Sequence, residues 1–271
     1  MMPVRGFTSL LVALCVAVAS PAIGSGGADV RLDPAPIHRL DAESLQRGAR
    51  NFVNYCLTCH SAKYMRYERL TDIGLTEQQI KDNLMFGTDK IGSTMTIAML
   101  PAEAKSWFGT VPPDLSVEAR IRGSDWLYNY FLAFYRDDQT TTGWNNLVFP
   151  NVAMPHILWQ LSGPGKLTET EFESHDKALA AAIGIKGLAK LEPAAGGKWV
   201  VKTVGVDPDA PGMLTPAQYQ AFVADLVNFL EYMGEPTKNK RISIGIAVLL
   251  YLGVLFVLVY ALKRLYWKDV H

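Results

Sequence analysis

The run Cys56-Leu57-Thr58-Cys59-His60 holds the residues of this chain that are best placed to do chemistry. CxxCH is the sequence pattern of covalent haem c attachment. On a helix, Cys56 and Cys59 share one face, so their sulfurs can reach the two vinyl groups on one edge of a porphyrin, and His60 is then directed at the iron. A zinc knuckle would need more Cys or His nearby, and a thioredoxin-like CxxC would not need the histidine. The motif therefore predicts one covalent haem c with His60 as its proximal ligand.

A second iron ligand must come from rigid backbone on the side of the ring opposite His60. Residues 147–156 show no periodicity, and in them Met154 stands between two prolines. A methionine thioether gives the high reduction potential that suits a terminal electron carrier. We therefore predict Met154 as the second ligand. His156, two residues away, is the competing candidate, and we expect it to pack or hydrogen-bond nearby.

A rigid turn at Pro112-Pro113 precedes a helical pattern that we expect to run from residue 117 to residue 136. A proline carbonyl here could accept the other ring N–H of His60 and so orient the imidazole, although an ordinary helix-starting Pro-Pro is an equally simple explanation. Arg120 could pair with a haem propionate, because a planar guanidinium suits a carboxylate. A surface arginine is the default alternative.

Two long helices are expected to support the motif. Residues 41–56 have apolar side chains at helical spacing after a possible N-cap at Asp41, and residues 215–234 form a second clean helical pattern. Gly48 costs helix propensity within the first helix, so it predicts close approach of another element, for which the second helix is the candidate.

Three further segments complete the predicted domain. Residues 76–86 should form another helix, and Met95 and Met99 are explained most simply as core residues four apart on a helix. Residues 162–212 predict a hairpin and a short helix, with residues 198–206 as a strand. The predicted fold is mainly α: a c-type cytochrome haem domain with long loops and a small hairpin, plus one C-terminal transmembrane helix.

Both ends of the chain carry apolar runs. Residues 1–24 resemble a secretory signal peptide, since the run is shorter than the roughly 20 residues that a membrane anchor needs. Cys15 could be the lipid-modified cysteine of a lipoprotein, but the preceding Leu14 is larger than the residue that normally stands before such a cysteine. The uncharged residues 242–262 are long enough to cross a membrane. We predict a signal peptide at 1–24, a periplasmic haem domain at 25–240, a transmembrane helix at 241–263 and a cytoplasmic tail at 264–271.

The charge balance limits the partners. The 271 residues include 26 Lys plus Arg and 26 Asp plus Glu, so nothing predicts binding to nucleic acid. A charged docking surface must then be local, and acidic side chains offer candidates. These are Asp137, Asp138, Glu169, Glu171 and Glu173. If the signal peptide is removed, the haem cysteines are the only cysteines left and no disulfide can form.

Several motifs together resemble the cytochrome c1 family, bacterial type, the haem c subunits of the quinol–cytochrome c oxidoreductase (bc1) complex. The resemblance covers nearly the whole mature chain, apart from the long stretch at residues 162–212, where many relatives have a shorter link. The matching motifs are Cys56-Leu-Thr-Cys59-His60-Ser61, Pro112-Pro113-Asp114-Leu115-Ser116, Asp125-Trp126-Leu127-Tyr128, Ala153-Met154-Pro155, Leu230-Glu-Tyr-Met-Gly-Glu-Pro236 and the C-terminal anchor.

The resemblance implies a haem ligated by His60 and Met154, with Pro112 and Pro113 against the ring and Arg120 toward a propionate. It also implies an electron-transfer subunit without substrate chemistry of its own, in a respiratory or photosynthetic chain. The donor would be the Rieske iron–sulfur protein beside cytochrome b, and the acceptor a cytochrome c. The location would be the cell inner membrane, single-pass, with the haem domain in the periplasm. The alternative is an anchored monohaem cytochrome of a terminal oxidase or dehydrogenase; a haem peroxidase would need an open distal position.

Overall fold

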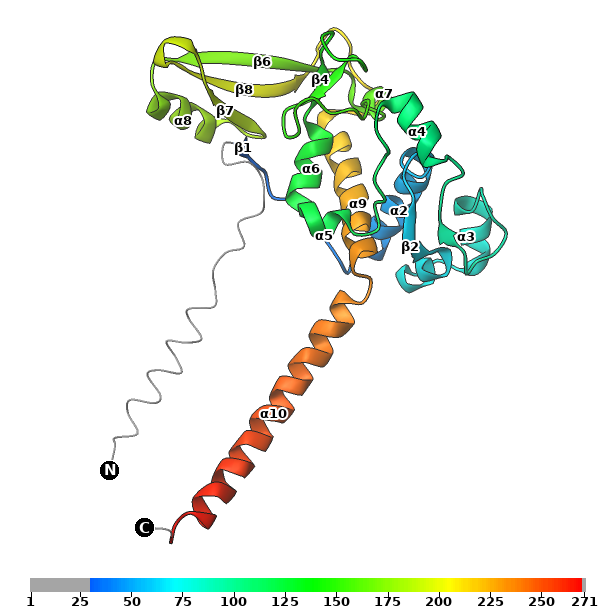
Figure 1. Ribbon diagram of the computed structural model, residues 1–271, viewed down its shortest axis with the longest axis vertical. Coiled ribbons are helices and arrows are strands. Elements are labelled where there is room, and N and C mark those ends of the chain that lie inside the picture. The colour runs from blue at the N-terminus through cyan, green and yellow to red at the C-terminus, as the bar shows by residue number, and fades with distance from the viewer. Residues whose placement is uncertain (1–29, 270–271) are drawn as a thin grey trace.

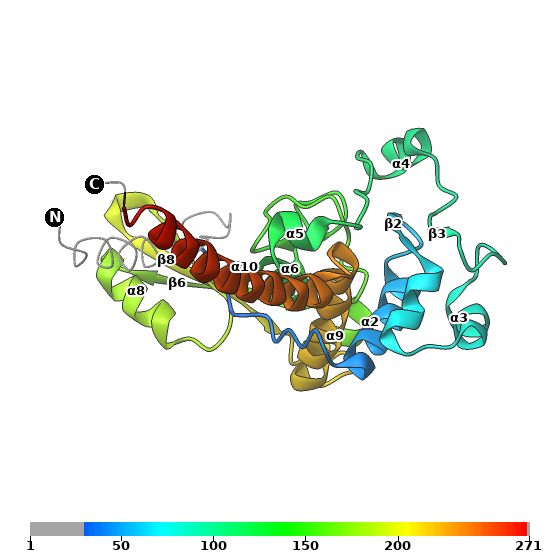
Figure 2. The ribbon, with the colours of Figure 1, turned by 90° about the horizontal axis from the view of Figure 1, so that it is seen from below.

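The computed structural model describes residues 30–269. The predicted signal peptide and Cys15 lie outside the described residues, as does the end of the predicted cytoplasmic tail. A mostly helical domain stands at one end of the long helix α10, which projects away from it (Figure 1). Within the domain, the segments divide into three groups. A sheet with α8 lies at one side, α5, α6 and α9 lie in the middle, and α3 and α4 lie at the other side (Figures 1 and 2).

Helices α2 (Ala42–Tyr55) and α9 (Pro216–Gly234) form the centre of the domain, close to the predicted bounds. Each begins where a side chain accepts a hydrogen bond from a free backbone N–H of the first turn. Asp41 accepts from the N–H of Ser44, and Thr215 forms a capping box with Gln218. The N-caps and the helical spacing of the apolar residues thus account for both helices.

The two helices cross at Gly48, as its position in the sequence predicted. A Cβ added to Gly48 would lie 2.1 Å from the backbone oxygen of Asp225 and 2.6 Å from Cβ of Phe229. One turn further on, the rings of Phe52 and Phe229 lie 5.7 Å apart and both side chains are fully buried. Only a residue without a side chain allows α9 to come this close.

Short elements connect the two long helices around this core. In chain order they are β2 (Ala62–Arg66), η1 (Tyr67–Ile73), α3 (Glu77–Leu84), β3 (Thr94–Met95), α4 (Pro101–Phe108), α5 (Glu118–Arg122), α6 (Ser124–Leu132), β4 (Phe134–Arg136), β5 (Trp144–Asn146) and α7 (Trp159–Ser162). Helix α3 matches the helix predicted at residues 76–86, and the Thr76 side chain caps it.

Two predictions about these elements were wrong. Met95 is buried as expected, but it lies on strand β3, and Met99 lies in the loop before α4, so the two do not share a helix. The helix predicted for residues 117–136 is divided at Gly123, which has φ +90°, and helical structure ends at Leu132. A left-handed φ suits glycine and interrupts a right-handed helix, so the same apolar spacing produces two helices and a strand.

The segment predicted as a hairpin with a short helix is larger than expected. Strands β1 (Val30–Arg31), β6 (Gly165–Phe172), β7 (Ala189–Pro193) and β8 (Trp199–Val206) form an antiparallel sheet in the order β1-β7-β8-β6, with η2 (Ala195–Gly197) between β7 and β8. Helix α8 (His175–Gly184) packs on it through Ala178 and Ala182. We call these elements the sheet module. A strand near the described N-terminus completes it, which local sequence patterns do not reveal.

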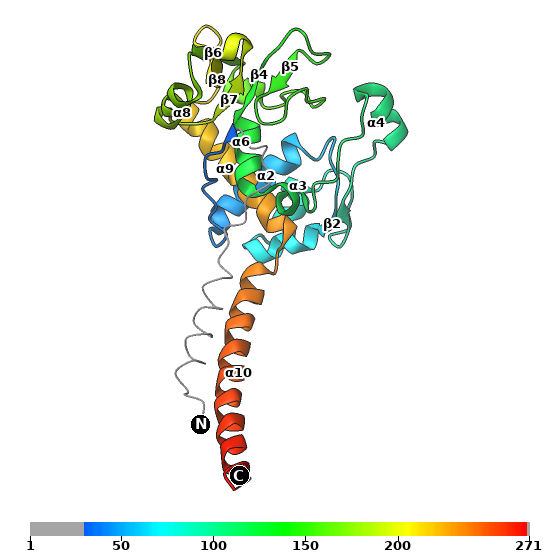
Figure 3. The same cartoon turned by 60° about the vertical axis from the view of Figure 1, so that its left-hand side comes forward.

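Helix α10 (Lys238–Tyr266) is longer than the predicted transmembrane helix, and the most apolar 18-residue stretch within its residues 240–266 has a mean hydropathy of 2.8. It extends away from the domain (Figure 3), and its apolar side chains are exposed along the helix. Two ion pairs join its first turn to the end of α9. Lys238 lies 2.9 Å from Glu231, and Arg241 lies 2.7 Å from Glu235. Length, composition and exposure all fit a helix that crosses a membrane.

Candidate haem site

The cysteine motif begins at the C-terminus of α2. Cys56 is the C-cap, its N–H bonds to the Phe52 carbonyl, and the N–H groups of Cys59 and His60 return to the Cys56 carbonyl at 3.1 and 2.9 Å. The motif therefore forms a turn that continues the helix. Both thiols are free, with Cys56 buried and Cys59 partly exposed. Burial raises the pKa of Cys56 to about 12, so it remains a neutral thiol at physiological pH.

His60 is oriented by the proline turn, which was one of the two explanations that the sequence left open for Pro112-Pro113. Its Nδ1–H donates to the backbone oxygen of Pro113 at 2.8 Å. Burial lowers the pKa of His60, although the Pro113 hydrogen bond opposes this effect. The imidazole is therefore neutral near pH 7, and Nε2 keeps a lone pair that can bind a metal. The hydrogen bond involves Pro113 alone, and the packing of Pro112 against the haem ring stays a prediction.

Backbone and side-chain hydrogen bonds fix the proline turn beside the chain that follows His60. The N–H of Leu115 donates to the Ser61 carbonyl at 2.8 Å, and the Asp114 carboxylate accepts from the N–H of Lys63 at 2.9 Å. The Ser116 hydroxyl accepts from the N–H of Tyr64 at 3.0 Å. The Pro-Pro-Asp-Leu-Ser motif thus supplies both the histidine acceptor and the groups that hold it in place.

Met154 lies in a non-helical loop between β5 and α7, as predicted, and is half-buried against the main core. Its sulfur accepts a hydrogen bond from the Tyr130 hydroxyl at 3.4 Å. The loop is fixed nearby at Asn151, which has φ +59° and whose N–H donates to the Asn145 side chain at 2.8 Å. Burial raises the pKa of Tyr130, so its hydroxyl is a protonated donor at neutral pH.

His156 packs and hydrogen-bonds nearby, as predicted. Its ring stacks on Phe134 with centroids 4.7 Å apart, and Trp144 approaches its edge at 5.2 Å. Nε2 lies 2.8 Å from the Ser162 hydroxyl. Burial lowers the pKa of His156 to about 4. The ring is therefore a neutral part of the core, with one nitrogen engaged by serine.

Arg120 makes contacts that the sequence did not suggest. Its side chain is largely exposed, with Nη1 3.8 Å from Glu235, and its Cγ would lie 3.1 Å from a Cβ added at Gly234. Arg120 thus connects α5 to the end of α9. These contacts neither include nor exclude a propionate, so that role also stays a prediction.

Two side chains near Met154 were missed in the sequence. Arg122 lies over the Trp126 ring at 4.9 Å from its centroid, and Trp126 stacks on Tyr130 at 5.0 Å with an interplanar angle of 11°. Arg122 is the last residue of α5, whereas Trp126 and Tyr130 lie four apart on α6, so helical spacing was an available signal only for the second pair. Arg122, Trp126 and Tyr130 form a continuous series of contacts that ends at Met154 through the Tyr130 hydroxyl. We call these four residues the α6 stack.

Three of the five acidic candidates lie in ion pairs with basic side chains. On the sheet module, Glu169 pairs with Lys202 and Glu171 pairs with Lys198, each at 3.1 Å. Asp138 lies 3.7 Å from Arg136. Pairing with Lys202 of β8 and with Lys198 just before that strand neutralises most of the negative charge that the sequence of β6 suggested.

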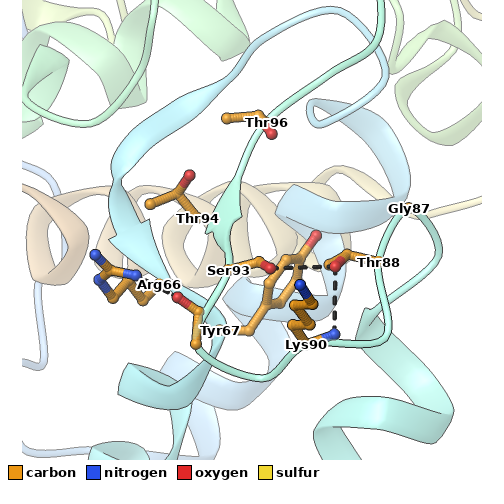
Figure 4. A pocket seen from close by; sticks show the side chains of 9 residues that line it. Arg66, Tyr67, Gly87, Thr88, Lys90, Ser93, Thr94 and Thr96 are labelled. Carbon is orange, nitrogen blue, oxygen red and sulfur yellow. Dashed lines mark hydrogen bonds between the residues drawn. The ribbon is translucent and has the colours of Figure 1, made fainter.

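A polar groove lies elsewhere on the domain, beside β2 and β3 (Figure 4). It has a volume of about 660 Å³. Its lining residues are Arg66, Tyr67, Gly87, Thr88, Lys90, Gly92, Ser93, Thr94 and Thr96. None of them belongs to the predicted haem residues, so this groove is separate from the candidate haem site.

The donor set fits a haem and does not fit zinc. Within residues 30–269, no group of three or more His, Cys, Asp or Glu is arranged to hold a metal ion. Two free thiols next to a neutral imidazole, with Nδ1 already bonded, match the attachment and axial groups of haem c. A helix that ends in CxxCH, a proline-oriented histidine and one apolar C-terminal helix define a membrane-anchored c-type cytochrome.

Comparison with known proteins identifies the family. The model of the cytochrome C1 family matches residues 34–180 and 214–270, and this chain belongs to that family. The unmatched residues 181–213 lie mostly in the sheet module, where the sequence also departed from the family pattern. The family supports a bc1-type electron-transfer role with a haem c cofactor, and with α10 it fits a single-pass membrane protein.

Several relatives are similar over most of their length. The ammonia monooxygenase gamma subunit of Nitrosomonas europaea is 47% identical over 247 residues, covering 91% of this chain and 92% of the relative. The cytochrome c1 of Allochromatium vinosum is 42% identical over 265 residues, covering 97% and 99%. The cytochrome c1 of Rhodospirillum rubrum is 27% identical over 255 residues, covering 86% and 84%.

Proposed function

We propose that this chain binds one haem c through thioethers at Cys56 and Cys59, with His60 and Met154 as iron ligands. It then carries single electrons from the Rieske iron–sulfur protein to a cytochrome c. The observation that carries this proposal is the 2.8 Å hydrogen bond from His60 Nδ1–H to the Pro113 carbonyl. That bond fixes the tautomer and orientation in which Nε2 is the free ligand.

The haem supplies the one-electron redox couple, and the residues of the chain set its surroundings. Pro113 orients His60 and strengthens its donation, and Pro112 packs against the ring. The Met154 thioether favours the reduced iron and so a high potential. Arg120 and Arg122 are the two candidates to neutralise haem propionates. Arg122 is supported by its contact with Trp126, which stacks on the tyrosine that bonds to Met154.

The predicted location follows from the motif and the anchor. Haem c is attached on the outer side of an energy-transducing membrane, so the haem domain lies in the periplasm and α10 crosses the cell inner membrane. Cytochrome b and the Rieske protein are the proposed neighbours in the bc1 complex. The exposed apolar surface of α10 and the family's bc1-type role support this placement.

The ligands can be tested by substitution in the full chain. Met154→Leu should remove the methionine–iron absorption band, lower the midpoint potential strongly and open the iron to carbon monoxide. Met95→Leu and His156→Ala are the controls, and neither should open the iron. Protein that is denatured and run on a gel should keep its haem unless both cysteines are replaced. A carbon monoxide complex in His156→Ala, with none in Met154→Leu, would show that the wrong residue was chosen.

A second candidate function comes from the relative that is named as a monooxygenase subunit. Its 47% identity leaves open that this chain serves an oxidase, monooxygenase or dehydrogenase as an anchored cytochrome. Extraction in mild detergent separates the two functions. Co-purification with cytochrome b and an iron–sulfur subunit supports the bc1 complex. Their absence, together with surviving quinol–cytochrome c activity after deletion of this chain, supports the second candidate.

A further inference from the structure

The Tyr130 hydroxyl has an unusual hydrogen-bond partner. The side chain is 8% exposed, and a buried tyrosine hydroxyl normally finds an oxygen or nitrogen acceptor. Here it donates to Met154 Sδ at 3.4 Å, although a thioether is a weak acceptor. Another buried tyrosine of this core, Tyr219, donates to the Phe131 carbonyl at 2.9 Å. The packing around Tyr130 therefore directs its hydroxyl at the sulfur.

The ring of Tyr130 has little freedom to turn away. Trp126 stacks on one face, and Phe131 and Phe134 contact it edge to face at 5.5 and 5.0 Å. The backbone is fixed as well, because Asn146 Nδ2 donates to the Tyr130 carbonyl at 2.8 Å. The hydroxyl is thus a positioned donor, held by neighbours on α6, β4 and β5.

A thioether sulfur has two lone pairs, so it can bind iron with one and accept a hydrogen bond with the other. The hydrogen bond draws electron density from the sulfur and weakens its donation to the metal. Ferric iron depends on that donation more than ferrous iron does. A donor at this sulfur therefore stabilises the reduced state and raises the reduction potential.

We propose that Tyr130 is a positioning residue that holds the Met154 thioether toward the haem iron and raises the reduction potential through its hydroxyl. The inference rests on the proposed ligation by Met154. It adds a residue outside the CxxCH, Pro-Pro and Met-Pro motifs to the groups that set the potential. The acting group is one hydroxyl, so Tyr130→Phe removes it and keeps the stacked ring.

The test uses the full chain in detergent with its haem. Net hydrogen-bond energies correspond to a roughly two- to tenfold change in an equilibrium constant. We therefore expect Tyr130→Phe to lower the reduction equilibrium constant about two- to tenfold, or about 20 to 60 mV at 59 mV per tenfold. Haem content and the methionine–iron band should persist.

Tyr219→Phe is the matched control, since it removes a buried hydroxyl from the same core without touching Met154. It should reduce stability and leave the potential unchanged. An unchanged potential in Tyr130→Phe, or an equal shift in Tyr219→Phe, overturns the inference. Met154→Leu separates this failure from that of the ligand assignment: if it removes the methionine–iron band, the ligation stands whatever Tyr130→Phe shows. If the band survives in Met154→Leu, the ligation and the inference both fail.

Discussion

Gly48→Ala should destabilise the domain because one methyl group does not fit between α2 and α9. The added Cβ would lie 2.1 Å from the Asp225 oxygen, and ordinary contact begins at 3.4 Å, so the helices must separate by about 1.3 Å. That shift disturbs the bonds of the Asp225 carboxylate to Ser44 and Arg47, both 2.6 Å long. Overpacking costs about 1 to 3 kcal/mol and a weakened charged hydrogen bond about 1.5 to 3, whereas alanine returns about 1 through helix propensity.

The expected net loss is about 1.5 to 5 kcal/mol, which lowers the melting temperature by roughly 3 to 20 °C for a domain of this size. Thermal unfolding of the detergent-solubilised chain, followed by circular dichroism, measures it. Gly184→Ala is the control, because this helical glycine has nothing within 4 Å of an added Cβ and should be neutral or slightly stabilising. A Gly48→Ala protein that melts at or above the wild-type temperature would refute the steric argument.

Three other outcomes are expected. Burial acts to raise the pKa of Glu231, but bonds from Ser124 and Lys238 outweigh it and the pKa is lowered. The carboxylate therefore stabilises the fold above its ordinary pKa of 4.5, and the contribution is lost as the pH falls through the lowered folded value. Glu231→Gln should lower the free energy of unfolding by about 1 to 3 kcal/mol at pH 7. It should also reduce the fall of that free energy below pH 4.5, as measured by urea unfolding at several pH values; an unchanged fall would contradict this. A chain that ends after Pro236 should be exported as a soluble protein with an unaltered haem spectrum, and a changed spectrum would show that α10 contributes to the pocket. Combined Glu169→Gln, Glu171→Gln, Lys198→Gln and Lys202→Gln removes both ion pairs without changing the net charge, so it should leave the salt dependence of cytochrome c reduction unchanged; a clear loss of salt dependence in stopped-flow measurements would restore the acidic patch.

Local signals predicted much of the fold. The cap at Asp41, the helical spacing around Gly48 and the Pro-Pro turn led to α2, its crossing with α9 and the His60 hydrogen bond. Each depends on backbone geometry that one residue type imposes within a few positions. The uninterrupted apolar run of α10 was equally clear.

The errors arose where distant segments decide the structure. Strand β1 joins a sheet whose other strands lie more than 130 residues later, and no local pattern reports that pairing. Periodicity alone could not show that Gly123 adopts φ +90° and divides one expected helix into two. At the haem site, Arg120 was the predicted partner of a propionate and Arg122 was not considered, because the stacking of Arg122 on Trp126 depends on how α5 and α6 pack.

The crossing of α2 and α9 also constrains the order of assembly. The contact between Ser44 and Asp225 spans 181 positions, so the face of α2 that carries Gly48 and Phe52 does not meet α9 until nearly the whole domain has been made. Closing so long a loop is entropically costly and slow compared with forming the helix itself. On the proposed route of export, the segment with both cysteines would therefore remain accessible while most of the chain follows. The proposed haem attachment would then precede the closing of the core by α9.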